Sequence, residues 1–266
     1  MFKERLISGI VLVILMAVIL YAGGPFTLAA LLFLSIVGLR EFYRLYKIDT
    51  SILAGSGYLF AVIYYLVLYL CDEKYILPLI ILFFMTVMTI YVFSFPKYKG
   101  DQTTLIFFGF TYVVILLSYI YKIRVLENGG AYVVLAFISS WGNDTCAYCV
   151  GRLIGKHKMS PKLSPKKSIE GAIGGIVGAG LLGFAYGSLG NAYLSLSENS
   201  GLICALVCAA GAFISIIGDL AASAFKRDTG IKDYGKLIPG HGGVLDRFDS
   251  IIFTAPIVYY GLVFFG

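Results

Sequence analysis

Acids, bases and glycines are densest between Asp219 and Asp249, so this stretch is the part of the sequence best suited to chemistry. It joins an uncharged run of eighteen residues, 201–218, to an uncharged run of seventeen, 250–266. Charged side chains at the edge of a membrane are costly unless they have partners or a task. We therefore take this stretch as the first candidate for a functional site.

The spacing of the charged residues indicates what this stretch binds. Asp219, Ser223 and Lys226 fall at positions i, i+4 and i+7, on one face if the preceding helix continues that far. Asp246 and Asp249 are three residues apart and share a face if they are helical. Carboxylates and bases around a glycine-rich turn are typical of a Mg²⁺–nucleotide or Mg²⁺–pyrophosphate site, because Mg²⁺ binds carboxylates together with phosphate oxygens. The alternative is a solvated loop held by salt bridges, which would not explain an acid inside the helix.

A second group of polar residues interrupts the apolar stretch 131–150; it consists of Ser139, Ser140, Asn143, Asp144 and Thr145. An acid inside lipid is expensive, so Asp144 is expected to face the protein interior or a hydrated cavity. The alternative is an interfacial acid paired with Arg152 or Lys156. The loop that follows, 151–170, combines six basic residues with serines, which suits phosphate oxygens. The alternative for this loop is a topology signal alone.

The composition is that of an all-α, polytopic membrane protein. Hydrophobic residues make up 59% of the chain and charged residues 14%, against roughly 25% charged in an ordinary soluble domain. A helix needs about 20 apolar residues to cross the hydrocarbon core, and such runs recur along the whole sequence. About nine transmembrane helices are predicted, at 6–22, 25–39, 52–71, 76–94, 104–121, 131–150, 171–190, 201–225 and 250–265. In the seventh, Glu170 is expected in the first turn and the spacing of Gly174 and Gly178 favours close helix packing.

The Lys and Arg residues predict the orientation. If the N-terminus is cytosolic, 18 of the 21 lie in cytosolic segments, and the three outside are Lys74, Lys122 and Arg124. This places the C-terminus outside and the polar loops 151–170 and 226–249 in the cytosol. The net charge of +6 comes from short loops and favours anionic headgroups or phosphorylated substrates over nucleic acid. We expect region 1–125 to serve packing and oligomer contacts and region 126–266 to carry catalysis.

The central stretch resembles the signature of the phosphatidate cytidylyltransferases, also called CDP-diacylglycerol synthases. That signature runs Ser-x-hydrophobic-Lys-Arg, four residues, Lys-Asp-x-small, two residues, hydrophobic-Pro-x-His-Gly-Gly, hydrophobic-x-Asp-Arg-hydrophobic-Asp. Every specified position is filled in this chain, by Ser223, Lys226, Arg227, Lys232, Asp233, Gly235, Ile238, Pro239, His241, Gly242, Gly243, Asp246, Arg247 and Asp249. The wider resemblance covers the multi-span architecture and the segment S-P-K-K-S-I-E-G, and it is vaguer in the N-terminal half.

The resemblance implies a reaction in which CTP and phosphatidic acid give CDP-diacylglycerol and pyrophosphate at a bacterial inner membrane. Mg²⁺ is the expected cofactor, and a second metal ion is left open. Asp219 and Asp246 are expected to hold metal, with Asp249 as a further ligand or close neighbour. The groups expected to bind phosphate are Lys226, Arg227, Lys232 and Arg247. The residues expected to orient the substrate or line its pocket are Ser223, His241, Gly242, Gly243, Asp144, Lys166 and Lys167.

Two other function classes fit parts of this pattern. A CTP-dependent polyprenol kinase would transfer the γ-phosphoryl group of CTP and release CDP instead of pyrophosphate. A transporter of an anionic solute would be expected to show inverted repeats and polar residues at the bilayer midplane. The sequence contains no obvious repeat and its polar residues gather at the predicted cytosolic edge, which favours an enzyme. Oligomeric state is left open, with a homodimer as one option.

Overall fold

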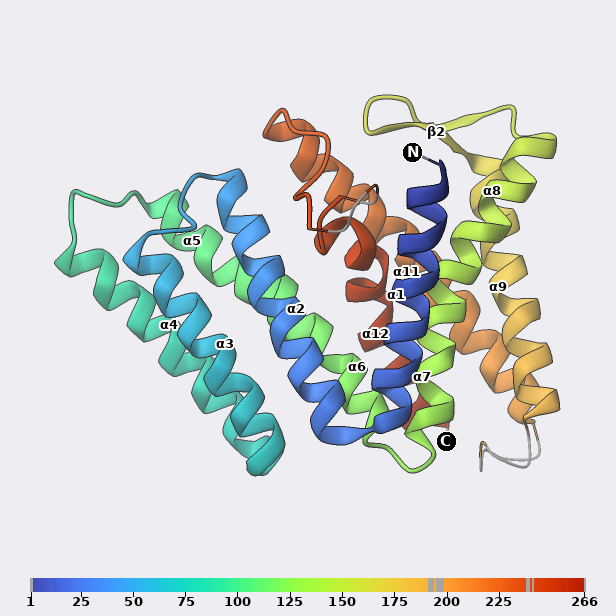
Figure 1. Cartoon of the computed structure of the whole chain (residues 1–266), viewed down its shortest axis with the longest axis horizontal. Coiled ribbons are helices and arrows are strands. Elements are labelled where there is room, and N and C mark those ends of the chain that lie inside the picture. Colours follow the sequence, from blue (N-terminus) through green and yellow to red (C-terminus); the bar gives the residue numbers. More distant parts are fainter. Residues whose placement is uncertain (1, 191–193, 195–198, 238–239, 241, 266) are drawn as a thin grey trace. The chain divides into compact units, whose positions relative to one another are not determined.

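The computed structural model describes residues 2–190, 194, 199–237, 240 and 242–265, and most of these residues are helical (Figure 1). In chain order the helices are α1 (Phe2–Ala22), α2 (Gly24–Leu45), α3 (Ile52–Leu70), η1 (Glu73–Tyr75), α4 (Ile76–Phe93), α5 (Gly100–Gly109), η2 (Phe110–Ile115), α6 (Leu116–Arg124), α7 (Gly129–Phe137), η3 (Ile138–Gly142), α8 (Asn143–Ile154), α9 (Ile169–Leu189), α11 (Ser200–Asp228) and α12 (Leu245–Phe265). Two short strands, β1 (Lys158–Ser160) and β2 (Ser164–Ser168), lie between α8 and α9.

Within the described residues, seven helical segments are long and apolar enough to cross a membrane. They are 24–45, 52–70, 73–93, 100–124, 169–189, 200–228 and 245–265. A shorter apolar helix covers Gly9–Ala22. The predicted sixth span corresponds to α7, η3 and α8, which follow one another without a break from Gly129 to Ile154. The chain is therefore an all-α polytopic membrane protein, while the count of nine spans and the orientation stay predictions.

Two features differ from the sequence-based expectation. The second span was expected to end at residue 39, but α2 continues to Leu45, and Glu41, Phe42 and Tyr43 in its last turns are buried. The segment 151–170 was predicted to be a polar loop, but α8 continues to Ile154 and an antiparallel hairpin follows, in which Lys158 pairs with Ser168 and Ser160 with Ser164. This hairpin has no alternation of apolar and polar residues that would have revealed it.

The chain divides into two compact units, and each is described by itself. The first comprises residues 1–118 and 231–247; the second comprises residues 119–230 and 248–266. A division near residue 125 was expected, but the inclusion of 231–247, which holds most of the signature loop, with the N-terminal helices was not foreseen. The N-terminal part of the chain thus supports part of the signature directly.

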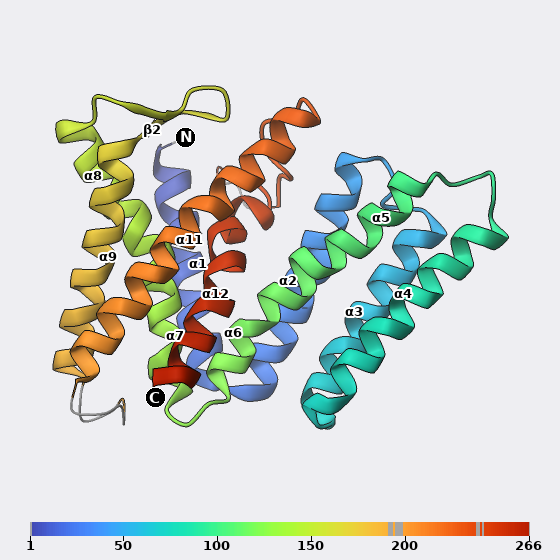
Figure 2. The ribbon, with the colours of Figure 1, turned by 180° about the vertical axis from the view of Figure 1, so that it is seen from behind.

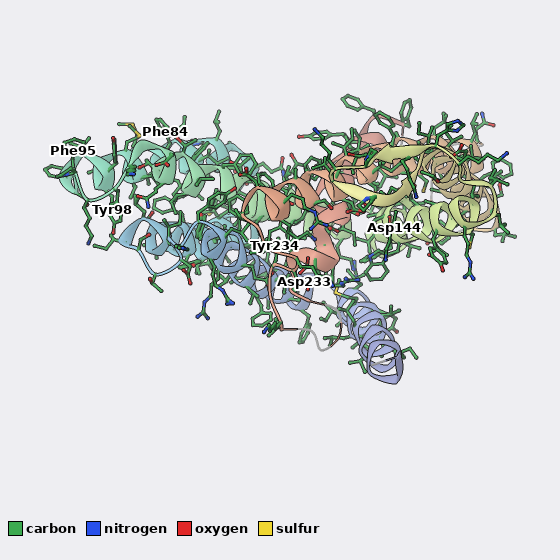
Figure 3. All side chains as sticks on the ribbon, turned by 90° about the horizontal axis from the view of Figure 1, so that it is seen from above. Phe84, Phe95, Tyr98, Asp144, Asp233 and Tyr234 are labelled. Carbon is green, nitrogen blue, oxygen red and sulfur yellow. The ribbon has the colours of Figure 1, made fainter. Side chains whose placement is uncertain are left out.

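The first unit has an aromatic core beneath a lipid-facing surface. Its helices α2 to α5 pack as neighbours, and α3 and α4 lie side by side (Figure 1). In the core, the hydroxyl of Tyr43 donates a hydrogen bond to the carbonyl of Ile106 at 2.8 Å. On the outer face, Phe84 of α4 and Phe95 of the following loop are 46% and 69% exposed (Figure 3). Large exposed apolar side chains on a helix are the expected surface towards lipid.

In the second unit, α9 packs against both α8 and α11 through its glycines (Figure 2). Gly174 lies against Val150 and Gly178 against Cys146, which confirms the packing role predicted for this pair. Further along, Gly183 lies against Cys208. Gly187, one turn later, lies against Cys204. In both helix pairs the contacted residue number falls as the number along α9 rises, so α9 is antiparallel to α8 and to α11.

The close contact at Gly183 makes a prediction about stability. A Cβ atom there would lie 2.6 Å from the carbonyl oxygen of Cys204, whereas one at Gly180 would lie 3.5 Å from Ala209. We expect Gly183→Ala to lower the free energy of unfolding by about 1–3 kcal/mol through overpacking. Gly180→Ala is the matched control and should be neutral or slightly stabilising, because Ala is the better helix former. Thermal unfolding in detergent measures both, and equal unfolding temperatures would contradict the predicted contact.

Candidate active site

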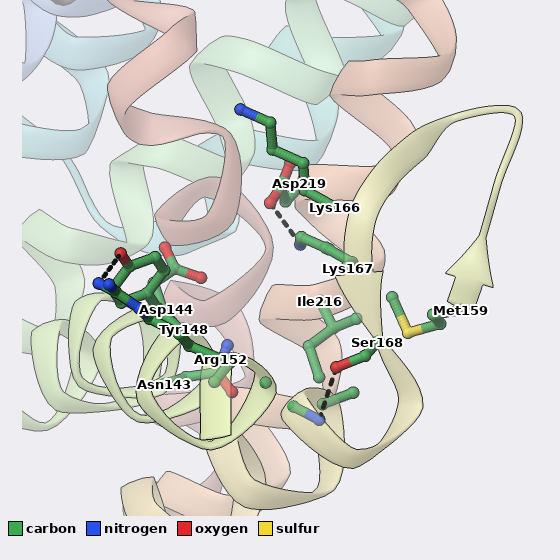
Figure 4. A pocket seen from close by; sticks show the side chains of 14 residues that line it. Asn143, Asp144, Tyr148, Arg152, Met159, Lys166, Lys167, Ser168, Ile216 and Asp219 are labelled. Atoms are coloured by element: carbon green, nitrogen blue, oxygen red, sulfur yellow. Dashed lines mark hydrogen bonds and ion pairs between the residues drawn. The ribbon is translucent and has the colours of Figure 1, made fainter. Parts of the chain in front are cut away.

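Asp219 lies in α11 and is paired with a lysine from the neighbouring hairpin. Its Oδ2 atom forms an ion pair with Nζ of Lys167, which belongs to β2 (Figure 4). The hydroxyl of Ser223, one turn later, donates to Asp219 Oδ1 at 3.4 Å. Because α11 continues to Asp228, the predicted shared face of Asp219, Ser223 and Lys226 exists. The partly buried acid within α11 is thus paired with a cation.

Asp249 brings a second carboxylate into the same unit. It lies in α12, is partly buried, and is within electrostatic range of Asp219, Lys226 and Asp144. The two helices approach closely at Gly218, where a Cβ atom would lie 2.8 Å from the carbonyl oxygen of Asp249. Only a residue without a side chain allows this approach, one position before Asp219. Two carboxylates from two consecutive helices are thereby brought near each other and near lysine.

An open pocket of about 380 Å³ surrounds the Asp219–Lys167 pair (Figure 4). Its polar or charged lining consists of Asn143, Asp144, Tyr148, Arg152, Lys166, Lys167, Ser168 and Asp219, and its apolar lining includes Met159 and Ile216. Asp144 is exposed and faces this cavity, as expected for an acid in an apolar stretch. The pocket therefore combines cations that suit phosphate with acids that suit a divalent metal.

Asn143 lines this pocket and carries a buried polar atom without a partner in the described part of the chain. The residue is 1% exposed, and its Oδ1 atom has no hydrogen-bond partner among the described residues. It directly follows η3, a π-helical turn, which displaces the α8 side chains relative to those of α7. Such turns are frequent at functional sites. A buried carbonyl oxygen without a partner is the kind of group that a bound cation or water satisfies.

The hairpin that carries Lys166 and Lys167 is anchored on the first turn of α9. Glu170 accepts hydrogen bonds from the backbone N–H groups of Lys156 and His157 at 3.1 and 3.2 Å, and its Oε1 atom lies 2.6 Å from Nδ1 of His157. Ser168 caps the same helix by accepting from the N–H of Gly171 at 3.1 Å. The prediction that Glu170 lies in the first turn of this helix is confirmed. Its contacts with Lys156 and His157, which lead into the hairpin, were not predicted from the sequence.

In the first unit, Asp246 organises the signature loop. Its Oδ2 atom accepts hydrogen bonds from the N–H groups of Tyr234 and Gly243 at 2.8 and 2.9 Å. Gly242 has a φ of +87°, and a Cβ there would lie 2.7 Å from this same oxygen. The carboxylate predicted to bind metal thus also fixes the backbone of the loop, on which Figure 3 marks Asp233 and Tyr234.

The sequence can be compared with known proteins. A family model described as "Cytidylyltransferase family" matches residues 3–265. The chain belongs to this family.

Three relatives, each named phosphatidate cytidylyltransferase, are similar over almost their whole length. The protein from Staphylococcus epidermidis is 31% identical over 261 residues, covering 96% of this chain and 97% of the relative. The protein from Haemophilus influenzae is 30% identical over 285 residues, covering 98% of both. The protein from Bacillus subtilis is 31% identical over 283 residues, covering 99% of this chain and 98% of the relative.

The remaining predicted residues of this cytidylyltransferase have varied surroundings. Arg227, Lys232 and Arg247 are exposed, and Lys226 is partly buried. His241 lies outside the described residues. Among those described, no three Asp, Glu, His or Cys side chains come close enough together to hold a metal ion by themselves. A Mg²⁺ ion here would therefore depend on one or two carboxylates together with substrate phosphates, which is its common mode of binding.

One residue that sequence reasoning missed is Glu41. It was assigned to a polar loop because the second span was expected to end at residue 39. In the structure it is 6% exposed in α2, and its carboxylate accepts from the N–H groups of Val244 and Leu245 at 3.0 and 2.9 Å. The one available signal was its position between the apolar residues Leu39 and Phe42 in a helix-compatible stretch.

The anchoring role of Glu170 can be tested by its removal. We expect Glu170→Ala to loosen the hairpin and so raise the KM for CTP or phosphatidic acid about 10-fold. This is the lower end of the range of effects seen when a residue that orients a ligand-binding group is removed. The same substitution at Glu127, an exposed glutamate in the loop before α7, is the matched control. Steady-state kinetics measure the KM of both variants, and Glu127→Ala should leave it unchanged. An unchanged KM in Glu170→Ala would show that the hairpin does not depend on this anchor.

Proposed function

We propose that this chain transfers the cytidylyl group of CTP to phosphatidic acid, forming CDP-diacylglycerol and releasing pyrophosphate. The family match over nearly the whole chain, the relatives with the printed name of that activity and the complete signature support this reaction. The structural observation that carries the proposal is the Asp219–Lys167 pair in an open pocket at one end of a membrane-spanning helix.

The reaction joins two anions, so its barrier lies mainly in charge repulsion and alignment. A phosphate oxygen of the lipid attacks the α-phosphorus of CTP, and the bond from that phosphorus to the oxygen bridging the α- and β-phosphates breaks. The attacking phosphate is already ionised near neutral pH, so no general base is needed. Lys167 and Lys226 are proposed to neutralise the phosphates, with Lys166 and Arg152 at the pocket wall.

Mg²⁺ fits the donor set of the second unit. Asp219 and Asp249 are the proposed carboxylate ligands within this unit. Asp246, which the sequence also predicted to hold metal, belongs to the first unit. When bound, Mg²⁺ would supply positive charge to the reacting phosphates. Lys167 lies where it can hold a phosphate oxygen beside the same carboxylate, and Ser223 keeps Asp219 oriented.

We also propose that the pocket faces the cytosol at a bacterial inner membrane. The antiparallel packing of α9 and α11 supports a common side for the hairpin 158–168 and the end of α11. The bias of Lys and Arg supports the cytosol as that side. Nine spans, a cytosolic N-terminus and a homodimer through the N-terminal helices are proposed on the sequence alone.

The decisive experiment supplies the purified protein with phosphatidic acid, Mg²⁺ and CTP labelled at the α-phosphate. Label is expected in the lipid fraction, together with release of pyrophosphate. A parallel reaction with CTP labelled at the γ-phosphate, and with a polyprenol as the lipid, tests the kinase alternative. Transfer of the γ-label to lipid, or no transfer of α-label to phosphatidic acid, would overturn the proposed reaction.

A further inference from the structure

A buried carboxylate on α2 takes no part in the mechanism described above. Glu41 is 6% exposed, although the bases on either side of it, Arg40 and Arg44, are exposed. A buried charge is costly unless hydrogen bonds compensate it. The reason for its burial therefore has to lie in what it contacts.

Glu41 contacts the beginning of α12. Its Oε1 atom accepts from the N–H of Val244 and its Oε2 atom from the N–H of Leu245, at 3.0 and 2.9 Å. These partners come more than 200 residues later in the sequence. The first N–H groups of a helix lack partners within the helix, and the positive end of the helix dipole favours an anion there. Glu41 thus supplies an N-terminal cap to α12 from a different helix.

The cap acts beside a second carboxylate. Asp246 accepts from the N–H groups of Tyr234 and Gly243, so two carboxylates together hold four N–H groups of the loop. Glu41 and Asp246 are close enough to repel each other electrostatically. This repulsion opposes folding, and the four hydrogen bonds offset it by fixing the loop in one conformation.

Two glycines of the signature lie directly against Glu41. A Cβ atom on Gly235 or on Gly243 would overlap with its carboxylate oxygens. The space that Glu41 occupies therefore explains why the signature requires a small residue at position 235 and a glycine at position 243. The signature loop and α2 fit each other as one packed assembly within the first unit.

We infer that Glu41 is a positioning residue for the signature: its carboxylate fixes the start of α12 and thereby the direction in which Asp246 and Arg247 project. The inference rests on the proposed function, because it assigns Glu41 to the support of that reaction. Glu41 is placed to act through its hydrogen bonds to the backbone N–H groups of residues 244 and 245.

The test replaces Glu41 by Gln, which keeps one acceptor oxygen but turns an NH₂ group towards the second backbone N–H. Turnover (kcat) is expected to fall about 10- to 100-fold, as for residues that orient a primary ligand, while the KM for phosphatidic acid changes little. The control is Ser35→Ala, which removes another buried hydrogen bond of α2, between the hydroxyls of Ser35 and Tyr65 at 2.9 Å, whose partner lies in α3 and not in the loop. Ser35→Ala should lower stability but leave the kcat of the folded protein unchanged.

Hydrogen–deuterium exchange gives a readout that does not require activity. Glu41→Gln is expected to speed exchange of the Val244 and Leu245 amides, and Ser35→Ala is not. Unchanged exchange, or a kcat equal to that of the wild type, would overturn the inference. If the unmodified protein makes no CDP-diacylglycerol, the proposed function fails, whereas the contact of Glu41 with the loop is still decided by exchange.

Discussion

Asp219→Asn is expected to lower kcat about 100- to 1,000-fold, the usual effect of removing one group that stabilises charge in a transition state. The amide has nearly the same shape as the carboxylate, so the helix and the bond from Ser223 are preserved. What is lost is the negative charge that pairs with Lys167 and that we propose to hold Mg²⁺. Turnover should therefore fail in a protein that remains folded.

The measurement is transfer of α-label from CTP to lipid over a range of Mg²⁺ concentrations, with thermal unfolding recorded alongside. Asp228→Asn is the matched control, because Asp228 is an exposed residue at the end of the same helix and outside the specified signature positions. Near-normal turnover in Asp219→Asn would remove this carboxylate from the site. An equal loss in both variants would point to a general effect of charge on the helix.

Asp246→Asn and Asp246→Ala are expected to separate two roles of one residue. Both backbone hydrogen bonds to Asp246 end on its Oδ2 atom. An Asn whose carbonyl oxygen occupies that position keeps both bonds and loses only the charge. We expect Asp246→Asn to be folded with turnover reduced about 100-fold or more, and Asp246→Ala to lose, in addition, the conformation of the loop.

Hydrogen–deuterium exchange at Tyr234 and Gly243 distinguishes the two outcomes, with label transfer measured on the same preparations. Exchange should be unchanged in Asp246→Asn and faster in Asp246→Ala. Full activity of Asp246→Asn would mean that this residue serves the loop alone and binds no metal. Faster exchange in both variants would mean that the charge, in addition to the oxygen position, holds the loop.

The sequence by itself determined those features that depend on residues close together in the chain. Apolar runs long enough for lipid predicted the helices, since crossing a membrane requires an unbroken local pattern. The intervals between Asp219, Ser223 and Lys226 predicted a shared helix face, because helical geometry relates residues three, four and seven positions apart. The signature identified the family for the same reason, as its residues lie within one short stretch.

Only the tertiary structure decided which distant residues meet. Lys167 reaches Asp219 because a hairpin without a clear strand pattern is anchored by Glu170. Asp249 approaches Asp219 because Gly218 lets two helices come close. The burial of Glu41 could not be read from its neighbours in sequence, since its partners are the backbone N–H groups of α12. Such contacts join residues tens to hundreds of positions apart, and no local periodicity records them, because they are set by how whole helices pack.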